Sequence, residues 1–434
     1  QGLTRSRTEN REYFLKKGIT WSLISTSNVS FRWFDDGFLC DVSGSSYYVE
    51  NEQYSLLYVL GFLNSKISKE LISILNPTLN LNVKDILSLP IIHNEKRKLI
   101  IEQLVQQNID LVKEDWDLYE NSWDFQKSPL IKYKDETNLL EQAYDKRMTE
   151  FNKKYETLKC NEEEINRLFI DIYNVNNEFD FSVKDEEISL KKVSIDKDVR
   201  DFLSYVIGCL LGRYCIDKEG IVCLEEIVDS PSITMKNGLI HLTESPYFEN
   251  DIILRLREFL AKSFSPDTVN ENMQWLAEVL EMKKGEDAES RLRRYFLDEF
   301  FADHCKMYQK RPIYWLVDSG KHKGLRTLIY MHRYQSDTMA TIRYEHLQEI
   351  QAKYQNEITD LENRLVNPNL SASEKKKLTS EKTSFEKKMD ELREFDKRLA
   401  EIANEEIEID LDDGVKVNYE KFYRGGKGVL AKIK

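Results

Sequence analysis

The sequence predicts an α+β protein that is mostly helical. Long stretches repeat apolar residues at three- and four-residue steps, as amphipathic helices do. Short β-prone runs bounded by Ser, Asn, Asp and Gly occur in two places, near the N-terminus and after residue 310. The 434 residues are 41% hydrophobic and 32% charged, a composition that favours several folded domains over disorder.

Composition also limits the kinds of partner. The net charge is −13, so attraction to DNA has to come from a local basic face. The six cysteines form no CxxC pair and no zinc-ligand spacing, which favours reduced thiols in a cytoplasmic protein. No apolar run reaches the roughly 18 residues of a membrane span, and no membrane partner is expected. The first residue is Gln1 rather than Met, which favours a fragment of a longer protein.

Residues 1–92 are expected to form a small β-containing module. Three short strands are predicted between turn residues, at Ile19–Ser25, Val29–Phe34 and Phe38–Val42. A helix is predicted from Leu60, and Pro77 is expected to end it because the residue before a proline avoids helical angles. Asp85 is a candidate cap for the short run Ile86–Leu89, and Pro90 closes the module.

This module is locally basic. Between Thr4 and Phe34, six basic residues stand against two acids, although the whole chain is acidic. One interpretation is a DNA-facing surface with aromatic side chains among the cations, with Arg5, Arg7, Arg32 and Trp33 as candidate contacts. The other interpretation is a strand-rich core with a solvated flank.

Two helical regions are expected next. Residues 93–160 are predicted to be a helical spacer, with helices at Lys96–Leu118 and Asn138–Leu158. Residues 161–344 are predicted to be a helical domain whose acidic beginning, Asn161–Leu190, is a solvated face. The strongest helix in this domain is Arg200–Asp217, where Gly208 and Gly212 are expected to let another helix approach closely.

A basic β-hairpin is predicted at the end of that domain. Its strands are Ile313–Val317 and Leu325–Met331, around a loop that contains Gly320 and Gly324. From His304 to Ser336 there are seven basic residues and one acid. The loop is therefore either a phosphate-contacting element or a lysine-rich solvated tip, and its candidate DNA contacts are Lys321, Lys323 and Arg326.

Residues 345–406 are predicted to form an antiparallel coiled-coil hairpin. Apolar seams recur on both halves, and Asn367-Pro368-Asn369 forms the turn between them. Ser371 and Glu374 have the spacing of a capping box at the start of the second helix. Residues 407–434 are expected to be a C-terminal tail.

Several stretches resemble one family. They are GITWSLIS, YVLGFLNSK, LNPTLNLNVKDILSLPI, RDFLSYVIGCLLGRYCID, RPIYWLVDSGK and YMHRY. Together they resemble the PglX family, the adenine-specific DNA methyltransferases of BREX phage-defence systems. Single-chain type II restriction–modification enzymes share the same pieces. The resemblance implies that residues 1–92 are part of a target-recognition domain. It also implies double-stranded DNA and other BREX proteins as partners.

The catalytic parts of that family are not found in this sequence. No glycine-rich S-adenosylmethionine loop follows a strand, and Asn76-Pro77-Thr78 and Asn367-Pro368-Asn369 lack the second proline and the aromatic of the adenine-holding motif. No catalytic, cofactor-binding or metal-ligating residue is therefore expected here, and S-adenosylmethionine is implied only for the parent enzyme. The chain is expected to be the C-terminal part of such an enzyme, without its catalytic domain.

Two functions remain open on this basis. The first is sequence-specific recognition of duplex DNA for an adenine methyltransferase. The second is a protein-interaction scaffold, in which the coiled coil and the acidic segment dock partner subunits and DNA is held elsewhere.

Overall fold

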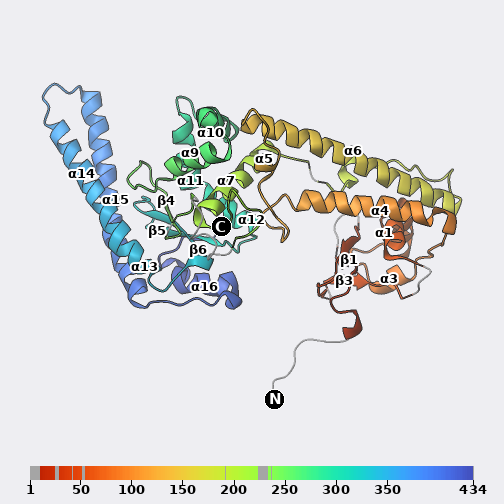
Figure 1. Cartoon of the computed structure of the whole chain (residues 1–434). Helices are drawn as coiled ribbons and strands as arrows, with labels where there is room; N and C mark the ends of the chain where they lie inside the picture. The colour runs from red at the N-terminus through yellow and green to blue at the C-terminus, as the bar shows by residue number, and fades with distance from the viewer. Residues whose placement is uncertain are drawn as a thin grey trace, which may run out of the picture. The chain divides into compact units, whose positions relative to one another are not determined.

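The computed structural model describes residues 10–24, 29–41, 43–50, 54–190, 192–222, 233–235 and 237–433. The chain divides into two compact units. The first unit comprises Gln1–Trp116 and Thr149–Lys192, and the second comprises Asp117–Met148 and Val193–Lys434. Each unit contains one three-stranded antiparallel sheet together with several helices (Figure 1), so the predicted mostly helical α+β class is confirmed.

The sheet of the first unit has β1 (Gly18–Ser22) at its centre, between β2 (Arg32–Phe34) and β3 (Gly44–Tyr47). The first two strands lie where they were predicted. The predicted third strand was wrong, because Phe38–Asp41 is not a strand and Val42 lies outside the described residues. β3 contains Gly and Ser and has no apolar alternation. It is held by its ladder to β1, where Trp21 pairs with Ser45.

The helix predicted from Leu60 is two helices, α1 (Leu56–Asn64) and α2 (Lys66–Leu75). Ser65 separates them with an extended backbone, and its side chain accepts a hydrogen bond from the Ser68 amide. The predicted role of Asp85 as the cap was wrong, because the N-cap is Asn82 and Asp85 is the third residue of the helix, where its carboxylate accepts from the Asn82 amide at 3.0 Å. The capped helix, α3 (Val83–Leu87), begins before the predicted run.

The two long helices of this region are α4 (Glu95–Trp116) and α6 (Leu140–Tyr173). α6 continues through the domain boundary expected between residues 160 and 161. Ile165, Leu168 and Phe169 of α6 are buried in the core of the first unit. The beginning of the acidic segment is therefore a core helix rather than a solvated face.

The sheet of the second unit has the order β4-β6-β5. The predicted hairpin is confirmed as β5 (Tyr314–Asp318) and β6 (Arg326–Tyr330), and β4 (Leu239–His241) adds a strand that the sequence analysis missed. Alternate residues of β5 belong to different cores, because successive side chains of a strand point to opposite faces. Tyr314 and Leu316 belong to the core that contains α7. Trp315 and Val317 belong to the core that contains the C-terminal helices.

The remaining helices of the second unit cover these two faces. The first face carries α5 (Pro129–Lys132), α7 (Ile195–Leu211), α9 (Ile252–Ser263), α10 (Val269–Val279), α11 (Ala288–Asp298) and α12 (Phe300–Met307). The other carries α13 (Thr338–Thr341), a π-helix (Ile342–Leu347), α14 (Gln348–Leu365), α15 (Ala372–Asn404) and α16 (Gly414–Tyr423). Short 3-10 turns complete the chain at Arg11–Tyr13, Asp185–Glu187, Pro266–Thr268, Met331–Arg333, Leu411–Asp413 and Arg424–Gly426.

The glycines of α7 do not admit another helix, and this expectation was wrong. A Cβ atom on Gly208 would lie 2.6 Å from the Tyr214 ring and 2.9 Å from the Tyr314 hydroxyl. Gly212 has φ +81° and ends α7 in the left-handed conformation. The close approach at Gly208 therefore serves two aromatic side chains.

The predicted helical hairpin is confirmed. α14 and α15 lie side by side and antiparallel (Figure 1), with Ile350, Tyr354, Leu392 and Leu399 buried between them and the sheet. The predicted capping box is also present, because the Ser371 hydroxyl accepts from the Glu374 amide at 3.2 Å. Among the described helices, none is both long and apolar enough to cross a bilayer.

Candidate nucleic-acid interface

The loop between β5 and β6 is fixed to α15 by one carboxylate. Glu391 accepts hydrogen bonds from the Ser319 hydroxyl at 2.6 Å, the His322 amide at 2.6 Å and the Gly324 amide at 3.1 Å. A carboxylate with three donors in a partly buried position is a strong local restraint. The loop is therefore built as part of the α15 surface rather than as a free tip.

The two glycines of this loop allow that close approach. A Cβ atom on Gly320, where φ is +143°, would lie 2.9 Å from the Glu391 carboxylate. A Cβ atom on Gly324 would lie 2.9 Å from the Leu392 side chain. Glycine was expected here to bring the backbone close to a phosphate, and in the structure it brings the backbone close to α15.

The three cations predicted in the loop have different surroundings. Lys321 is exposed, and no carboxylate partner for it is found among the described residues. Lys323 forms an ion pair with Asp298. Arg326 binds Asp318 through two nitrogens, at 3.1 and 2.9 Å, and donates to the Leu297 carbonyl. Of the three, only Lys321 keeps its charge available for a ligand without breaking a contact.

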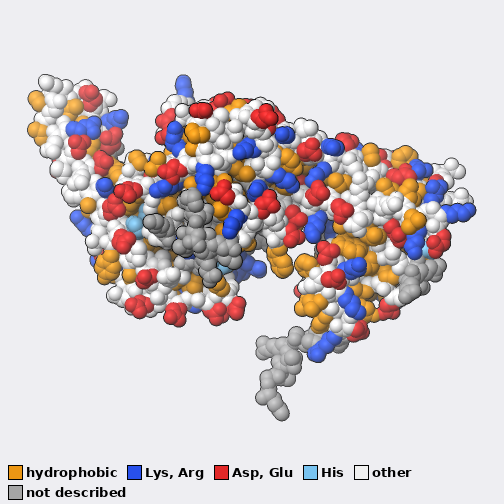
Figure 2. All heavy atoms as spheres, in the orientation of Figure 1, with side chains coloured by type: hydrophobic (Ala, Val, Ile, Leu, Met, Phe, Trp, Pro, Cys, Tyr) orange, Lys and Arg blue, Asp and Glu red, His pale blue; other side chains and the backbone are white. Residues whose placement is uncertain are grey.

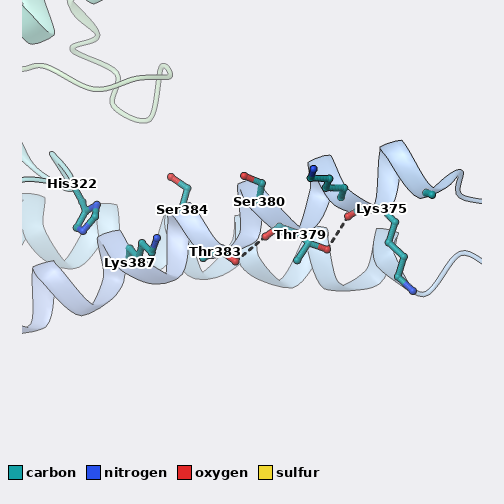
Figure 3. A pocket seen from close by; sticks show the side chains of 9 residues that line it. His322, Lys375, Thr379, Ser380, Thr383, Ser384 and Lys387 are labelled. Carbon is teal, nitrogen blue, oxygen red and sulfur yellow. Dashed lines mark hydrogen bonds between the residues drawn. The ribbon is translucent and has the colours of Figure 1, made fainter.

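Below the loop tip, a groove runs along one face of α15 (Figure 3). We call it the α15 groove, and it is lined by His322, Ala372, Lys375, Lys376, Thr379, Ser380, Thr383, Ser384 and Lys387. Its lining holds three lysines and no acid. The sequence analysis missed these residues, although lysine or hydroxyl side chains recur there at four-residue steps, the spacing of one helix face.

The acidic side chains in the same half of α15 do not line the groove and have other contacts. Glu374 belongs to the capping box, and Glu381 lines a second groove on the α14 side. Glu386 pairs with Lys382 at 3.4 Å. Because the lysines line the groove and these acids do not, the α15 groove is a local basic face on an acidic chain. Figure 2 shows basic and acidic side chains interleaved over most of the visible surface.

The candidates of the first unit are less clearly grouped. Arg5 and Arg7 lie outside the described residues. Arg32, on β2, donates from Nη1 to the Ser189 hydroxyl at 3.0 Å, and burial of its guanidinium lowers its pKa while Glu162 raises it. Trp33, which pairs with Ile19 of β1, is half-buried and donates to Asp35 at 2.8 Å. These two side chains are neighbours on β2, and both already have protein partners.

The two described sheets differ from the parallel sheet on which α/β methyltransferases bind S-adenosylmethionine. In open α/β folds such a cofactor binds at the carboxyl ends of parallel strands. Both sheets described here are antiparallel and have three strands. Asn76 of the first Asn-Pro sequence is a helix cap whose amide donates to Asp85, and Asn367 of the second lies in the α14–α15 turn. Neither asparagine has the surroundings of an adenine-holding motif.

The comparisons with known proteins agree with the sequence resemblance. The chain is 35% identical over 435 residues to adenine-specific methyltransferase PglX of Lacticaseibacillus casei (strain Zhang), an alignment that covers 97% of this chain. It is 33% identical over 450 residues to adenine-specific methyltransferase BrxX of Escherichia coli O9:H4 (strain HS), covering 96% of this chain. The chain is PglX/BrxX-like. It spans 35% and 37% of the length of these two relatives, and no protein-family model matches it.

Two of the stretches that carry the PglX/BrxX resemblance meet inside the second unit. From α7, Ser204 donates to the buried Glu120 carboxylate at 2.7 Å, and the ring of Tyr205 stacks at 5.2 Å on that of Tyr214, which follows the helix. From β5, Tyr314 stacks on His304 at 4.5 Å and reaches Gly208. These residues build the core, so the resemblance at these positions reflects packing and not a surface site.

Proposed function

We propose that the chain is the DNA-recognition and C-terminal region of an S-adenosylmethionine-dependent, adenine-specific DNA methyltransferase of a BREX phage-defence system, acting in the cytoplasm. The observation that carries the proposal is the similarity to PglX and BrxX along nearly the whole chain. Their names assign adenine-specific methylation to those proteins. Because this sequence has neither the cofactor loop nor the adenine-holding motif, it would serve the recognition part of such an enzyme.

Two kinds of contact with duplex DNA are proposed. The second unit would bind the phosphate backbone through Lys321 and the α15 groove, since lysine is a flexible point charge that suits phosphates. The first unit would contribute to base reading through the module that holds Arg32 and Trp33, because arginine pairs with base edges in the major groove.

An exchange of regions tests this function. In the longer methyltransferase that contains this chain, the 434 residues are replaced by the aligned region of the L. casei protein. The sequence methylated by the chimera, read by methylation-sensitive sequencing, should be that of the L. casei enzyme. The reciprocal chimera is the control. If both chimeras are active, but each methylates the sequence recognised by the enzyme that supplied its catalytic part, target recognition does not reside in the exchanged region.

A protein-interaction scaffold is the second candidate, and one surface favours it. Ile74, Leu79 and Leu87 of the α2–α3 segment are 75%, 62% and 68% exposed. A group of exposed apolar side chains within one short segment can form a docking surface for a protein partner. Salt separates the two functions, because phosphate contacts release counterions and apolar docking does not. A partner complex that persists unchanged from 50 to 500 mM salt, roughly a tenfold range, together with undetectable DNA binding, would favour the scaffold.

A further inference from the structure

We infer that the α15 groove is a phosphate-binding track for one strand of duplex DNA. The inference rests on the proposed function and deepens it. It assigns the main backbone contacts to a helix face instead of to the hairpin loop alone.

The α15 groove carries an unneutralised positive charge. Lys375, Lys376 and Lys387 line the groove, and none of the three has an ion-pair partner among the described side chains. Elsewhere on α15, Arg393 and Lys397 are neutralised by acids one turn away, at 2.8 and 2.7 Å. An unneutralised group of lysines on a chain of charge −13 is a place where a polyanion gains energy by releasing its counterions.

The groove is long enough for several phosphates. Lys375 and Lys387 are twelve residues apart on one helix, and a rise of 1.5 Å per residue separates them by about 18 Å. Each strand of B-DNA rises 3.4 Å along the helix axis per phosphate, and because the strand also winds around that axis, successive phosphates lie farther apart than this rise. A straight groove of this length can therefore follow a few successive phosphates of one strand. Lys375 lies at one end of the row and His322 with Lys387 at the other (Figure 3).

A row of hydroxyl side chains lies between the lysines of the groove. Thr379 and Thr383 donate to backbone carbonyls four residues earlier, at 2.8 and 2.9 Å, so their protons are already used. Ser380 and Ser384 have no hydrogen-bond partner among the described residues and lie on the same groove. Serine hydroxyls can donate to phosphate oxygens, which is a common backbone contact in protein–DNA complexes.

The loop forms a wall at one end of the groove, where His322 lies beside Lys387. Glu391 fixes the His322 amide at 2.6 Å, and Arg398 donates to the Ser319 carbonyl at 3.0 Å. The position of His322 above α15 is therefore fixed by the protein itself. A preformed groove loses little conformational entropy when a ligand binds.

The test uses the longer methyltransferase that contains this chain and a random-sequence 30-base-pair duplex, about three turns of B-DNA. In the groove variant, Lys375→Ala, Lys376→Ala and Lys387→Ala are combined. Each lost phosphate contact should reduce the slope of log affinity against log salt by about 0.9, so the full effect is about 2.7. Alanine has the highest helix propensity, which preserves α15.

The matched control removes the same charge from the same hairpin. It combines Lys353→Ala, Arg393→Ala and Lys397→Ala, none of which lines the groove. It should keep the wild-type slope within about 0.9, the value of one contact. A second variant, Ser380→Ala with Ser384→Ala, should weaken binding without changing the slope, because a neutral hydroxyl releases no counterion.

The outcomes separate the two proposals. If the groove variant and the control have the same affinity and slope, the α15 groove is not the phosphate track, although the protein still binds DNA. If the serine variant binds as tightly as wild type, the hydroxyl contacts are wrong. If the wild-type protein itself shows no salt-dependent binding to duplex DNA, the proposed function fails first.

Discussion

Glu120 is the most unusual single residue of the second unit, because it is a carboxyl group in a fully buried position. It is 5% exposed, and one oxygen accepts from the Ser204 hydroxyl at 2.7 Å. Burial raises its pKa to about 7, although Arg213 and the Ser204 hydrogen bond both favour the charged form. Desolvation is therefore stronger than the two favourable contacts, and the neutral carboxyl is the form that the fold prefers.

This environment predicts a pH-dependent stability. The folded pKa lies above the ordinary value of 4.5, so the folded state holds the proton more tightly than the unfolded chain. Stability from this group is complete below about pH 4.5 and is lost as the pH rises to about 7. Glu120→Gln keeps the shape without the charge, and it should raise the midpoint of thermal unfolding at pH 8 relative to wild type.

The measurement is the difference in unfolding midpoint between variant and wild type from pH 4.5 to pH 8, followed by circular dichroism. The difference should grow with pH and correspond to up to about 3 kcal/mol at the alkaline end. The control is Glu401→Gln, at an exposed position of α15, which should show no such trend. A Glu120→Gln difference that is constant with pH would mean that Glu120 is charged in the folded protein.

At the scale of elements, the sequence predicted the features that depend on residues close together in the chain. The capping box of Ser371 and Glu374 and the β5–β6 hairpin depend on neighbouring residues, and both are present. β3 and β4 could not be predicted, because their side chains carry little pattern and their partners lie far along the chain. The division of one predicted helix at Ser65 also depends on tertiary contacts, since the next amide donates to Asn166.

In the candidate site, too, local features could be predicted from the sequence and long-range contacts could not. The basic character of the β5–β6 loop was visible in the sequence, and so were the lysines of α15. The ion pairs that occupy Lys323 and Arg326 were not, because Asp298 belongs to α11 and the Asp318 contact depends on strand register. Nor could the sequence show that the loop and α15 form one surface, because Glu391 lies about 70 residues from the amides that it binds.

Glu391 therefore predicts the order of the loop. Replacing it in Glu391→Ala removes three hydrogen bonds, each worth about 1.5–3 kcal/mol when one partner is charged. Amide hydrogen exchange of residues 319–325 should become faster, while α15 and the β5–β6 ladder keep their protection. Glu394→Ala, which removes an exposed carboxylate from the same helix, is the control. Equal exchange in the two variants would mean that packing of Gly324 on Leu392 is sufficient to hold the loop.

At the scale of the whole molecule, the two units are not consecutive segments of the sequence, so domains predicted as consecutive residue ranges cannot match them. α6 supplies residues to both units, and each unit is assembled from two separate parts of the sequence. The five described cysteines are free thiols, so none of this depends on covalent cross-links between them. Each unit is held by its own apolar core, one in the first unit and two on opposite faces of the sheet in the second.

This architecture predicts the behaviour of the isolated chain towards the cofactor. A methyltransferase site needs a glycine-rich turn at the carboxyl end of a parallel strand, where backbone amides and a helix N-terminus meet the ligand. The described strands form two antiparallel sheets, and the longest has five residues. Isothermal titration of S-adenosylmethionine into the 434-residue chain should give no binding heat up to millimolar concentration, about −4 kcal/mol in binding free energy. A longer methyltransferase of the proposed kind, titrated in parallel, should bind. Saturable binding to the chain alone would mean that it contains a cofactor site built on a different principle from that of the α/β methyltransferases.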